Sequence, residues 1–299
     1  MKQQGINPVS PDAFFPNRLK EKVLFITGVA KGSIGGATAI RAGREGAKVF
    51  CVDLKEKELQ ETCDQIKVEG GDAFPFLADV RDPLQVEIAV KKCVEVYGKI
   101  NLVLNAAGVM DGNDPSKPQD FENNLNLLPS PIHKATDEYW KNVMDANING
   151  LFYCLRAQLN QMVNQGEGGS IVNISSIAGI IGLPGNCAYS ASKHAVTGLT
   201  RNASIDYAPY GIRINSVNMA QTDTPMVFRA MEFVKWAVSQ GKGSGMAGLK
   251  SASLLSANDP QHRGSTPWEQ AATILFLLSD DASNITGSCI ATDGGWTTY

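Results

Sequence analysis

The chain has 299 residues, of which 43% are hydrophobic and 19% are charged, and its formal net charge is -3. This balance is that of an ordinary globular protein, and it leaves no strongly basic field to hold nucleic acid or an anionic membrane surface. No apolar run approaches the length that crosses a bilayer, and the first residues lack the apolar core of a secretory signal. We therefore expect no nucleic-acid partner and no membrane partner.

Six cysteines are scattered along the chain without a CxxC pair, and the three histidines show no metal-ligand spacing. This distribution argues against a zinc site and against a disulfide scaffold. Reduced, mostly buried thiols in a cytoplasmic compartment are the expected reading, and we predict no metal site.

Short apolar runs alternate with helix-forming segments in the first half of the chain. Residues 1–17 read as a polar arm. The predicted strands that follow are residues 22–27, 47–53, 73–78 and 100–105, and the predicted helices between them are residues 37–45, 55–69 and 83–97.

The alternation continues in the second half. The predicted elements are helical residues 137–165, strand 169–174, helix 188–208, strand 212–217, helix 267–278 and strand 289–293. Strands alternating with helices indicate an α/β fold, in which one doubly wound, Rossmann-like parallel sheet carries helices on both faces. No boundary divides residues 18–299, so we predict a single domain there.

Two stretches break this rhythm. Residues 111–134, rich in Pro, Asn and Asp, are predicted to be an inserted loop, functional or disordered, that covers the substrate pocket or forms an oligomer contact. Residues 221–266 begin with an amphipathic segment and continue into the flexible run GKGSGMAG, which suits a lid over a pocket. A plain surface helix and linker is the alternative for that region. The apolar lid candidates are Met226, Phe228, Met231, Phe233 and Trp236.

A glycine-rich stretch, residues 27–36, lies between the first predicted strand and the helix that follows it. Glycines there allow a pyrophosphate to approach the backbone, and the helix start presents free N–H groups. Asp53 ends the second predicted strand, where a carboxylate accepts hydrogen bonds from a ribose diol and repels a 2′-phosphate. Asp53 therefore favours NAD over NADP, although a helix N-cap is its structural alternative.

Tyr189 and Lys193 are four residues apart in a predicted helix and so share one face. A nearby ammonium group is expected to lower the pKa of the phenol, which suits proton exchange with an alcohol or ketone. Ser175 and Ser176 end a predicted strand at the carboxyl edge of the sheet, where ligands bind. One of the two serines is expected to contact the substrate oxygen and the other to form only the turn.

Taken together, these residues resemble the short-chain dehydrogenase/reductase family from about residue 19 to residue 296. The resemblance rests on the glycine-rich loop at residues 27–35, the acidic motif Asp79-Val80, the motif Asn105-Ala106-Ala107-Gly108, Asn147 in MDANINGLF, Ser176 thirteen positions before Tyr189, the Tyr189-x-x-x-Lys193 motif and the closing segment ITGSCIATDGGW. It implies that Tyr189 exchanges a proton with the substrate while a hydride passes to or from a nicotinamide. Lys193 would bind the ribose, Ser176 would orient the substrate oxygen, and Asn147 would hold a water that links Lys193 to solvent.

The resemblance also implies a set of cofactor contacts. The expected cofactor-binding residues are Gly28, Lys31, Gly32, Ser33, Ile34, Gly35, Asp53, Leu54, Asp79, Val80, Asn105, Ala106, Ala107, Gly108, Tyr189, Lys193, Thr222 and Thr224. The expected substrate contacts are Ser176, Tyr189, Met226, Phe228 and Trp236. Family members are usually homotetramers or homodimers, and we expect the same here.

The sequence departs from the family pattern in three places. The glycine loop is one residue longer than usual, and Lys31 within it is typical of NADP-dependent relatives, which opposes the indication from Asp53. Met219-Ala220 stands where Pro-Gly is usual, near the place that holds the nicotinamide. The leading hypothesis is an NAD-dependent oxidoreductase acting on an apolar, cyclic secondary alcohol or ketone. The alternative is a non-redox isomerase or cyclase that keeps NAD as a bound ligand.

Overall fold

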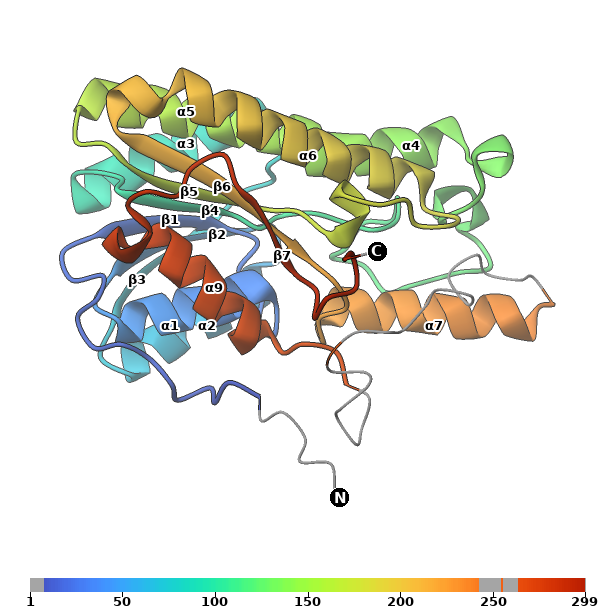
Figure 1. The fold of residues 1–299 in the computed structure, drawn as a ribbon. Coiled ribbons are helices and arrows are strands. Elements are labelled where there is room, and N and C mark those ends of the chain that lie inside the picture. The colour runs from blue at the N-terminus through green and yellow to red at the C-terminus, as the bar shows by residue number, and fades with distance from the viewer. Residues whose placement is uncertain (1–7, 242–253, 255–262, 299) are drawn as a thin grey trace, which may run out of the picture.

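A computed structural model describes residues 8–241, residue 254 and residues 263–298 of the chain. Its centre is a seven-stranded parallel sheet with the strand order β3-β2-β1-β4-β5-β6-β7 (Figure 1). The strands are β1 (Val23–Thr27), β2 (Lys48–Asp53), β3 (Asp72–Leu77), β4 (Leu102–Asn105), β5 (Gly169–Ile174), β6 (Ile212–Met219) and β7 (Cys289–Thr292). The doubly wound parallel sheet predicted from the sequence is confirmed.

Helices cover both faces of the sheet, and Figure 1 shows the two layers on opposite sides of the strands. One layer consists of α1 (Ile34–Arg44), α2 (Glu56–Val68) and α9 (Pro267–Leu278). The other consists of α3 (Pro83–Tyr97), α5 (Gly150–Gln165) and α6 (Cys187–Asp206). The helices α4 (Asp137–Met144) and α7 (Pro225–Ser239) both lie toward the end of the molecule at which the strands finish (Figure 1).

The alternation of side chains along β1 divides the core into its two halves. Leu24 and Ile26 point into the apolar cluster beneath α1, α2 and α9, whereas Val23 and Phe25 point into the cluster beneath α3, α5 and α6. Because both faces are covered, every residue of β1 is buried, which explains why buried parallel strands read as continuous apolar runs.

Local chemistry moved several element boundaries away from the predicted ones. Helix α1 begins at Ile34 rather than residue 37, because the Ser33 hydroxyl caps it by accepting from Gly36 N at 2.9 Å. The predicted helix over residues 137–165 is α4 and α5 joined by one π-helical turn, Asp145–Asn149. The inserted loop contains two short 3-10 turns, Leu125–Leu127 and Ile132–Lys134. Most of the predicted flexible run, residues 242–248, lies outside the described residues.

The last residues of the predicted arm pack against the end of α1 through a buried carboxylate. Glu45 is fully buried, and it accepts from Arg18 Nε at 2.7 Å, from Arg41 Nε at 3.0 Å and from the backbone of Phe15 at 3.4 Å. One carboxylate therefore pairs with two largely buried guanidinium groups and fixes the chain as it enters β1.

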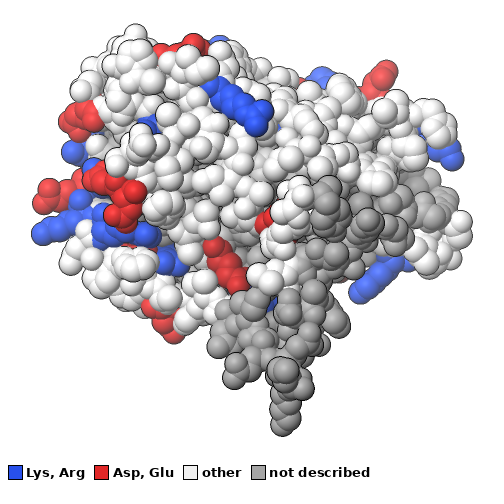
Figure 2. Space-filling view, viewed as in Figure 1, with Lys and Arg blue, Asp and Glu red and all other residues white. Residues whose placement is uncertain are grey.

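Charge is unevenly distributed over the face that Figure 2 shows. Acidic and basic side chains gather near its left margin, and few lie over the middle of this face. Among the described residues, no helix combines the length and apolar character needed to cross a bilayer.

We expect Glu45→Gln to lower the free energy of unfolding by about 3 kcal/mol or more, because it leaves two buried cations without their counter-charge. Urea denaturation followed by circular dichroism measures this loss.

Glu69→Gln is the matched control, because Glu69 pairs with Arg44 at a site where both side chains are partly exposed. Its loss should stay below about 1 kcal/mol. Equal losses in the two variants would show that the Glu45 network is not a buried anchor.

Candidate active site

The site lies where the strand order reverses. Strands β1 and β4 are neighbours in the sheet, although two strands separate them along the chain. Ligands of open parallel sheets bind at the carboxyl ends of the strands at such a point. There the backbone of Gly28 packs directly on the Ala106-Ala107 segment, and a Cβ atom on Gly28 would lie 2.6 Å from Ala107 N. Gly28 also has a φ of 76°, so both space and conformation demand glycine.

The glycine loop absorbs its extra residue at Gly32. Gly32 has a φ of 77°, which turns the chain into the Ser33 cap of α1. Gly35 lies in the first turn of that helix, and a Cβ atom there would lie 2.1 Å from Gly28 O. The loop and the helix start are therefore packed backbone against backbone. The free N–H groups of the first helical turn face a site that suits a phosphate, so the residues present fit a dinucleotide.

Asp53 faces the glycine loop from the end of β2. Its Oδ2 accepts from Ala30 N at 2.8 Å and its Oδ1 from Lys55 N at 2.9 Å, and the residue is 8% exposed. Burial raises the pKa of Asp53 against the lowering effect of these hydrogen bonds. The Lys31 ammonium is 3.3 Å from Glu61, so this loop cation already has an acidic partner on α2.

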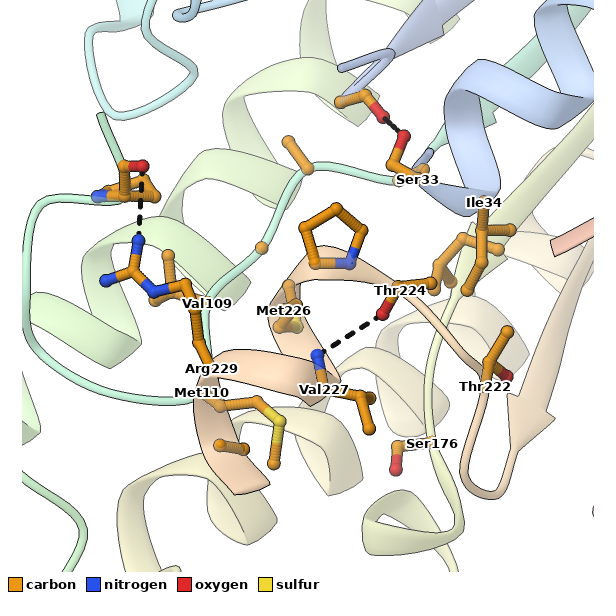
Figure 3. A pocket seen from close by; sticks show the side chains of 18 of the residues that line it. Ser33, Ile34, Val109, Met110, Ser176, Thr222, Thr224, Met226, Val227 and Arg229 are labelled. Atoms are coloured by element: carbon orange, nitrogen blue, oxygen red, sulfur yellow. Dashed lines mark hydrogen bonds between the residues drawn. The ribbon is translucent and has the colours of Figure 1, made fainter. Parts of the chain in front are cut away.

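A cavity of about 1150 Å³ opens beside the glycine loop and continues past the carboxyl ends of β5 and β6 to α7 (Figure 3). Most predicted site residues line it: Gly28, Lys31, Ser33, Ile34, Gly35, Asp53, Leu54, Asp79, Val80, Ala106, Ala107, Gly108, Ser176, Tyr189, Lys193, Thr222, Thr224 and Met226. Five do not line it: Gly32, Asn105, Asn147, Phe228 and Trp236. The predicted site therefore comes together as one cavity, with these five exceptions.

Tyr189 and Ser176 meet at the wall of the cavity. The Ser176 side chain lies close enough to the Tyr189 hydroxyl to lower its pKa, and it accepts from Ala178 N at 3.1 Å. Burial raises the pKa of Tyr189, and the nearby Ser176 side chain opposes that rise. We predicted that the Lys193 ammonium would lower this pKa. The predicted direction was wrong, because loss of hydration raises the pKa of Tyr189 overall.

Lys193 lies one helical turn beyond Tyr189 on the same face of α6. Its Nζ donates to Ile174 O at 3.0 Å and is 5.7 Å from the centre of the Tyr189 ring. Burial lowers the pKa of Lys193 to about 8. Burial thus moves apart two pKa values that nearly coincide in water, because it raises that of the Tyr189 phenol and lowers that of the Lys193 amine.

The two adjacent serines have separate roles. Ser175 Oγ donates to Lys193 O at 3.2 Å and also lies 3.3 Å from Thr197 Oγ1, so it ties the strand end to α6. Ser176 is the serine whose hydroxyl meets Tyr189. The assignment of Ser176 as the substrate-facing serine agrees with this geometry.

Asn147 supports the site from behind. Its amide donates to Val109 O at 2.8 Å and to Ser192 Oγ at 3.0 Å, and its Oδ1 accepts from Val109 N at 2.7 Å. These bonds join the segment after β4 to α6, one residue before Lys193. Through these bonds Asn147 positions the walls of the cavity. Asn105 acts similarly, because it bonds to Gln158 and Asn173 inside the sheet layer.

Helix α7 divides its apolar residues between two sides. Met226 and Met231 line the cavity, whereas Phe228 is 51% exposed and Trp236 packs against Phe121. The expected substrate contacts of Phe228 and Trp236 are therefore not present in the described structure. Other residues that line this half of the cavity were not among the predicted site residues: Val109, Met110, Ile177, Leu183, Val227, Ala230, Val234 and Trp296. The sequence gives a signal only for the three residues on α7, Val227, Ala230 and Val234, through their helical spacing.

The segment after β6 is held without the usual Pro-Gly. Met219 continues β6 as its last, buried residue and lines the cavity. Thr222 then pairs with Ser265, with 2.9 Å between their hydroxyl oxygens, and Thr224 caps α7 by accepting from Val227 N. These bonds fix the chain after β6, and both Thr222 and Thr224 line the cavity.

Comparisons with known proteins agree with this geometry. A protein-family model described as "Enoyl-(Acyl carrier protein) reductase" matches residues 28–297. A 3beta-hydroxysteroid dehydrogenase of Mediterraneibacter gnavus is 37% identical, covering 96% of this chain and 98% of the relative. A cyclohexanol dehydrogenase of Acinetobacter sp. is 33% identical, covering 94% of this chain and 97% of the relative. The crystal structure of carveol dehydrogenase from Mycobacterium avium in complex with NAD superposes with a TM-score of 0.80 at 27% identity, covering 95% of this chain and all of that one.

We expect Gly35→Ala to weaken NAD binding by at least about tenfold, equivalent to ~1.4 kcal/mol, because the new methyl group displaces the Gly28 carbonyl and the loop around it. Isothermal titration calorimetry with NAD measures the change.

Gly198→Ala is the control, because no atom lies within 4 Å of a Cβ atom at that position of α6. It should leave NAD affinity unchanged. An unaltered affinity in Gly35→Ala would contradict the close packing of the loop on the helix.

Proposed function

The chain belongs to the short-chain dehydrogenase/reductase family of oxidoreductases, and from that premise we propose that it interconverts a secondary alcohol and a ketone with NAD. The observation that carries this proposal is the meeting of Tyr189, Ser176 and Lys193 at one wall of the cavity, beside the glycine loop. A proton donor and acceptor, a hydroxyl that orients the substrate oxygen and a dinucleotide cradle are the groups that hydride transfer to or from a carbonyl requires.

The preference for NAD over NADP rests on the charges around the glycine loop. The Asp53 carboxylate lies against the loop backbone, where it would accept from a ribose diol and repel a 2′-phosphate. In the sequence, Lys31 is a feature that favours NADP instead. Its pairing with Glu61 weakens that objection, because a neutralised cation offers little attraction to a phosphate.

A bound nicotinamide would accept a hydride in alcohol oxidation or supply one in ketone reduction. Tyr189 takes up the hydroxyl proton of the alcohol during oxidation and donates a proton to the carbonyl oxygen during reduction. Ser176 holds the substrate oxygen beside the phenol, and Lys193 binds the ribose. Asn147 keeps the surrounding segments in register through Val109 and Ser192.

The proposed substrate is an apolar cyclic molecule. The half of the cavity beyond Tyr189 is walled mainly by aliphatic and sulfur-containing side chains, among them Met110, Leu183 and Met231. The names of the relatives described above refer to ring alcohols, namely a hydroxysteroid, cyclohexanol and carveol. Incubating the protein with NAD and a panel of such alcohols, while following the absorbance of reduced nicotinamide, tests the proposal directly. NAD binding without any absorbance change would favour the non-redox isomerase or cyclase.

Location and assembly are further parts of the proposal. The six cysteines are free thiols, four of them buried, which suits a reducing cytoplasm. Strand β7 is an edge of the described sheet, Phe276 on the neighbouring α9 is 37% exposed, and the face in Figure 2 carries few charges at its middle. A surface with few charges and an exposed Phe276 beside a strand edge supports a homotetramer or homodimer.

We expect Asp53→Ser to raise the KM for NAD by about tenfold or more, because a hydrogen bond to a charged group contributes about 1.5–3 kcal/mol. The same change should improve the use of NADP, because it removes a repulsive charge. Steady-state kinetics with each cofactor measures the ratio.

Asp64→Ser removes an exposed carboxylate from α2, outside the cavity, and should leave the ratio of the KM values for NAD and NADP unchanged. An unchanged ratio in Asp53→Ser would remove the argument for NAD preference.

We expect the rate of alcohol oxidation to rise by up to about tenfold per pH unit across about pH 6 to 9, whereas ketone reduction stays nearly flat. The sign follows from the raised pKa of Tyr189: the neutral phenol that reduction needs predominates, and the phenolate that oxidation needs increases with pH. Tyr189→Phe should lower kcat by at least about 100-fold and remove the pH dependence.

Tyr139→Phe removes a hydroxyl from the same buried cluster at a position that does not line the cavity. It should keep both the rate and the pH profile of the original protein. Full activity in Tyr189→Phe would exclude the proposed proton transfer.

A further inference from the structure

We propose that the inserted loop, residues 111–134, clamps helix α7 over the outer half of the cavity, with Phe121 as the positioning residue. The clamp would determine how tightly the enzyme binds the part of a large cyclic substrate that lies away from Tyr189. This inference rests on the proposed function, because it concerns the substrate of the same cavity.

The first observation is an aromatic cluster between the loop and the helix. The Phe121 ring centre is 5.9 Å from that of Phe233 and 5.6 Å from that of Trp236, and the two helical rings are 6.2 Å apart. These spacings lie within the range in which aromatic pairs attract beyond the area they bury. The side of α7 that carries Phe233 and Trp236 is therefore held by a ring from the loop.

Polar contacts reinforce the cluster one and two turns earlier on the helix. Arg229 Nη1 donates to Pro115 O at 3.3 Å, the contact drawn as a dashed line from Arg229 in Figure 3. With the Gln119 amide turned to the orientation that satisfies both of its neighbours, it accepts from Arg229 Nε at 3.0 Å and donates to Glu232 at 3.2 Å. The loop thus meets α7 through three of its residues over more than two turns.

The loop is itself anchored, so it can serve as a support. Its base is closed by Gly112 N donating to Leu127 O at 2.8 Å, and the Asn142 side chain on α4 donates to Gly112 O at 2.9 Å. Leu128 is buried next to this closure. The loop is therefore attached to α4, whose Tyr139 and Val143 pack in the same cluster as Tyr189.

The two ends of α7 are held in different ways. The near end is fixed by the Thr222–Ser265 pairing, by the Thr224 cap and by Pro225, which lies against Gly32. From Pro225 to Trp236 the helix rises about 16 Å. Among the described contacts, those that hold the far end come from the loop, so release of the clamp should move Met231 and Val234 more than Met226.

Because only the far end of α7 would move, loss of the clamp should have an effect that depends on substrate size. A small ring alcohol needs only the part of the cavity next to Tyr189, whereas a steroid also reaches the residues near the far end of α7. Loss of the clamp should therefore weaken binding of the large substrate and leave the reacting end of either substrate in place.

The test is Phe121→Ala in the full chain, assayed with NAD and two alcohols, cyclohexanol and the 3β-hydroxysteroid epiandrosterone. We expect the KM for the steroid to rise about tenfold, as for the loss of a well-packed aromatic contact, while its kcat and both constants for cyclohexanol change less than about twofold. Phe121→Tyr keeps the ring and should restore the original values.

Leu125→Ala is the matched control, because Leu125 is an apolar residue of the same loop that is 51% exposed. It should leave every constant unchanged. A Phe121→Ala variant that behaves like Leu125→Ala, or that loses both substrates equally, would overturn the proposal.

Hydrogen exchange of the free proteins separates this inference from the proposed function. Phe121→Ala should speed amide exchange over residues 229–239 and leave exchange in α1 unchanged. Unchanged exchange in α7 would overturn the clamp even in an active enzyme. If the original protein oxidised neither alcohol, the proposed function would fail for these substrates, and accelerated exchange would still establish the clamp.

Discussion

The close approach of two backbones at the end of β1 is the constraint on which the site depends. Gly28 packs on Ala107, and Gly35 packs on Gly28, at separations that leave no room for a Cβ atom. These contacts bring the start of α1 to the point where β1 and β4 diverge. Every other part of the site is placed relative to that junction: Asp53 bonds into the glycine loop, and Asn147 bonds to Val109 just beyond the Ala106-Ala107 segment.

Burial shifts the pKa values of the two reacting groups in opposite directions. The same loss of hydration that disfavours the Tyr189 phenolate disfavours the Lys193 ammonium, so the two pKa values, which nearly coincide in water, move apart. Sequence spacing could identify the pair but not this effect, because a four-residue interval does not say how much water surrounds the two side chains. Ser176 lies beside the phenol and lowers its pKa, while the neighbouring Ser175 donates to the helix backbone.

How far the sequence predicts the structure depends on the range of the interactions. The buried strands and the glycine loop correspond to short, continuous sequence patterns, so their positions along the chain were predicted well. The substrate side was predicted less well, because apolar residues on α7 look alike in composition. Spacing separates them: Met226, Ala230 and Val234 recur on the cavity side, whereas Phe233 and Trp236 face Phe121, more than a hundred residues earlier in the chain. Such a partner lies beyond the reach of any local pattern.

The single π-helical turn between α4 and α5 has a consequence for insertions and deletions in this chain. A π turn holds one residue more than an α turn, and successive residues of a helix are about 100° apart around its axis. Because the extra residue is taken up within this one turn, deleting one residue from Asp145–Asn149 would restore a regular helix and keep α4 and α5 in phase. Deleting one residue from α4 instead would rotate α5 by that angle relative to the start of α4. Leu151, Leu155 and Leu159 would then turn away from the sheet core that they now fill. A change in length by one residue is therefore easier to accommodate within this turn than in the helices on either side of it.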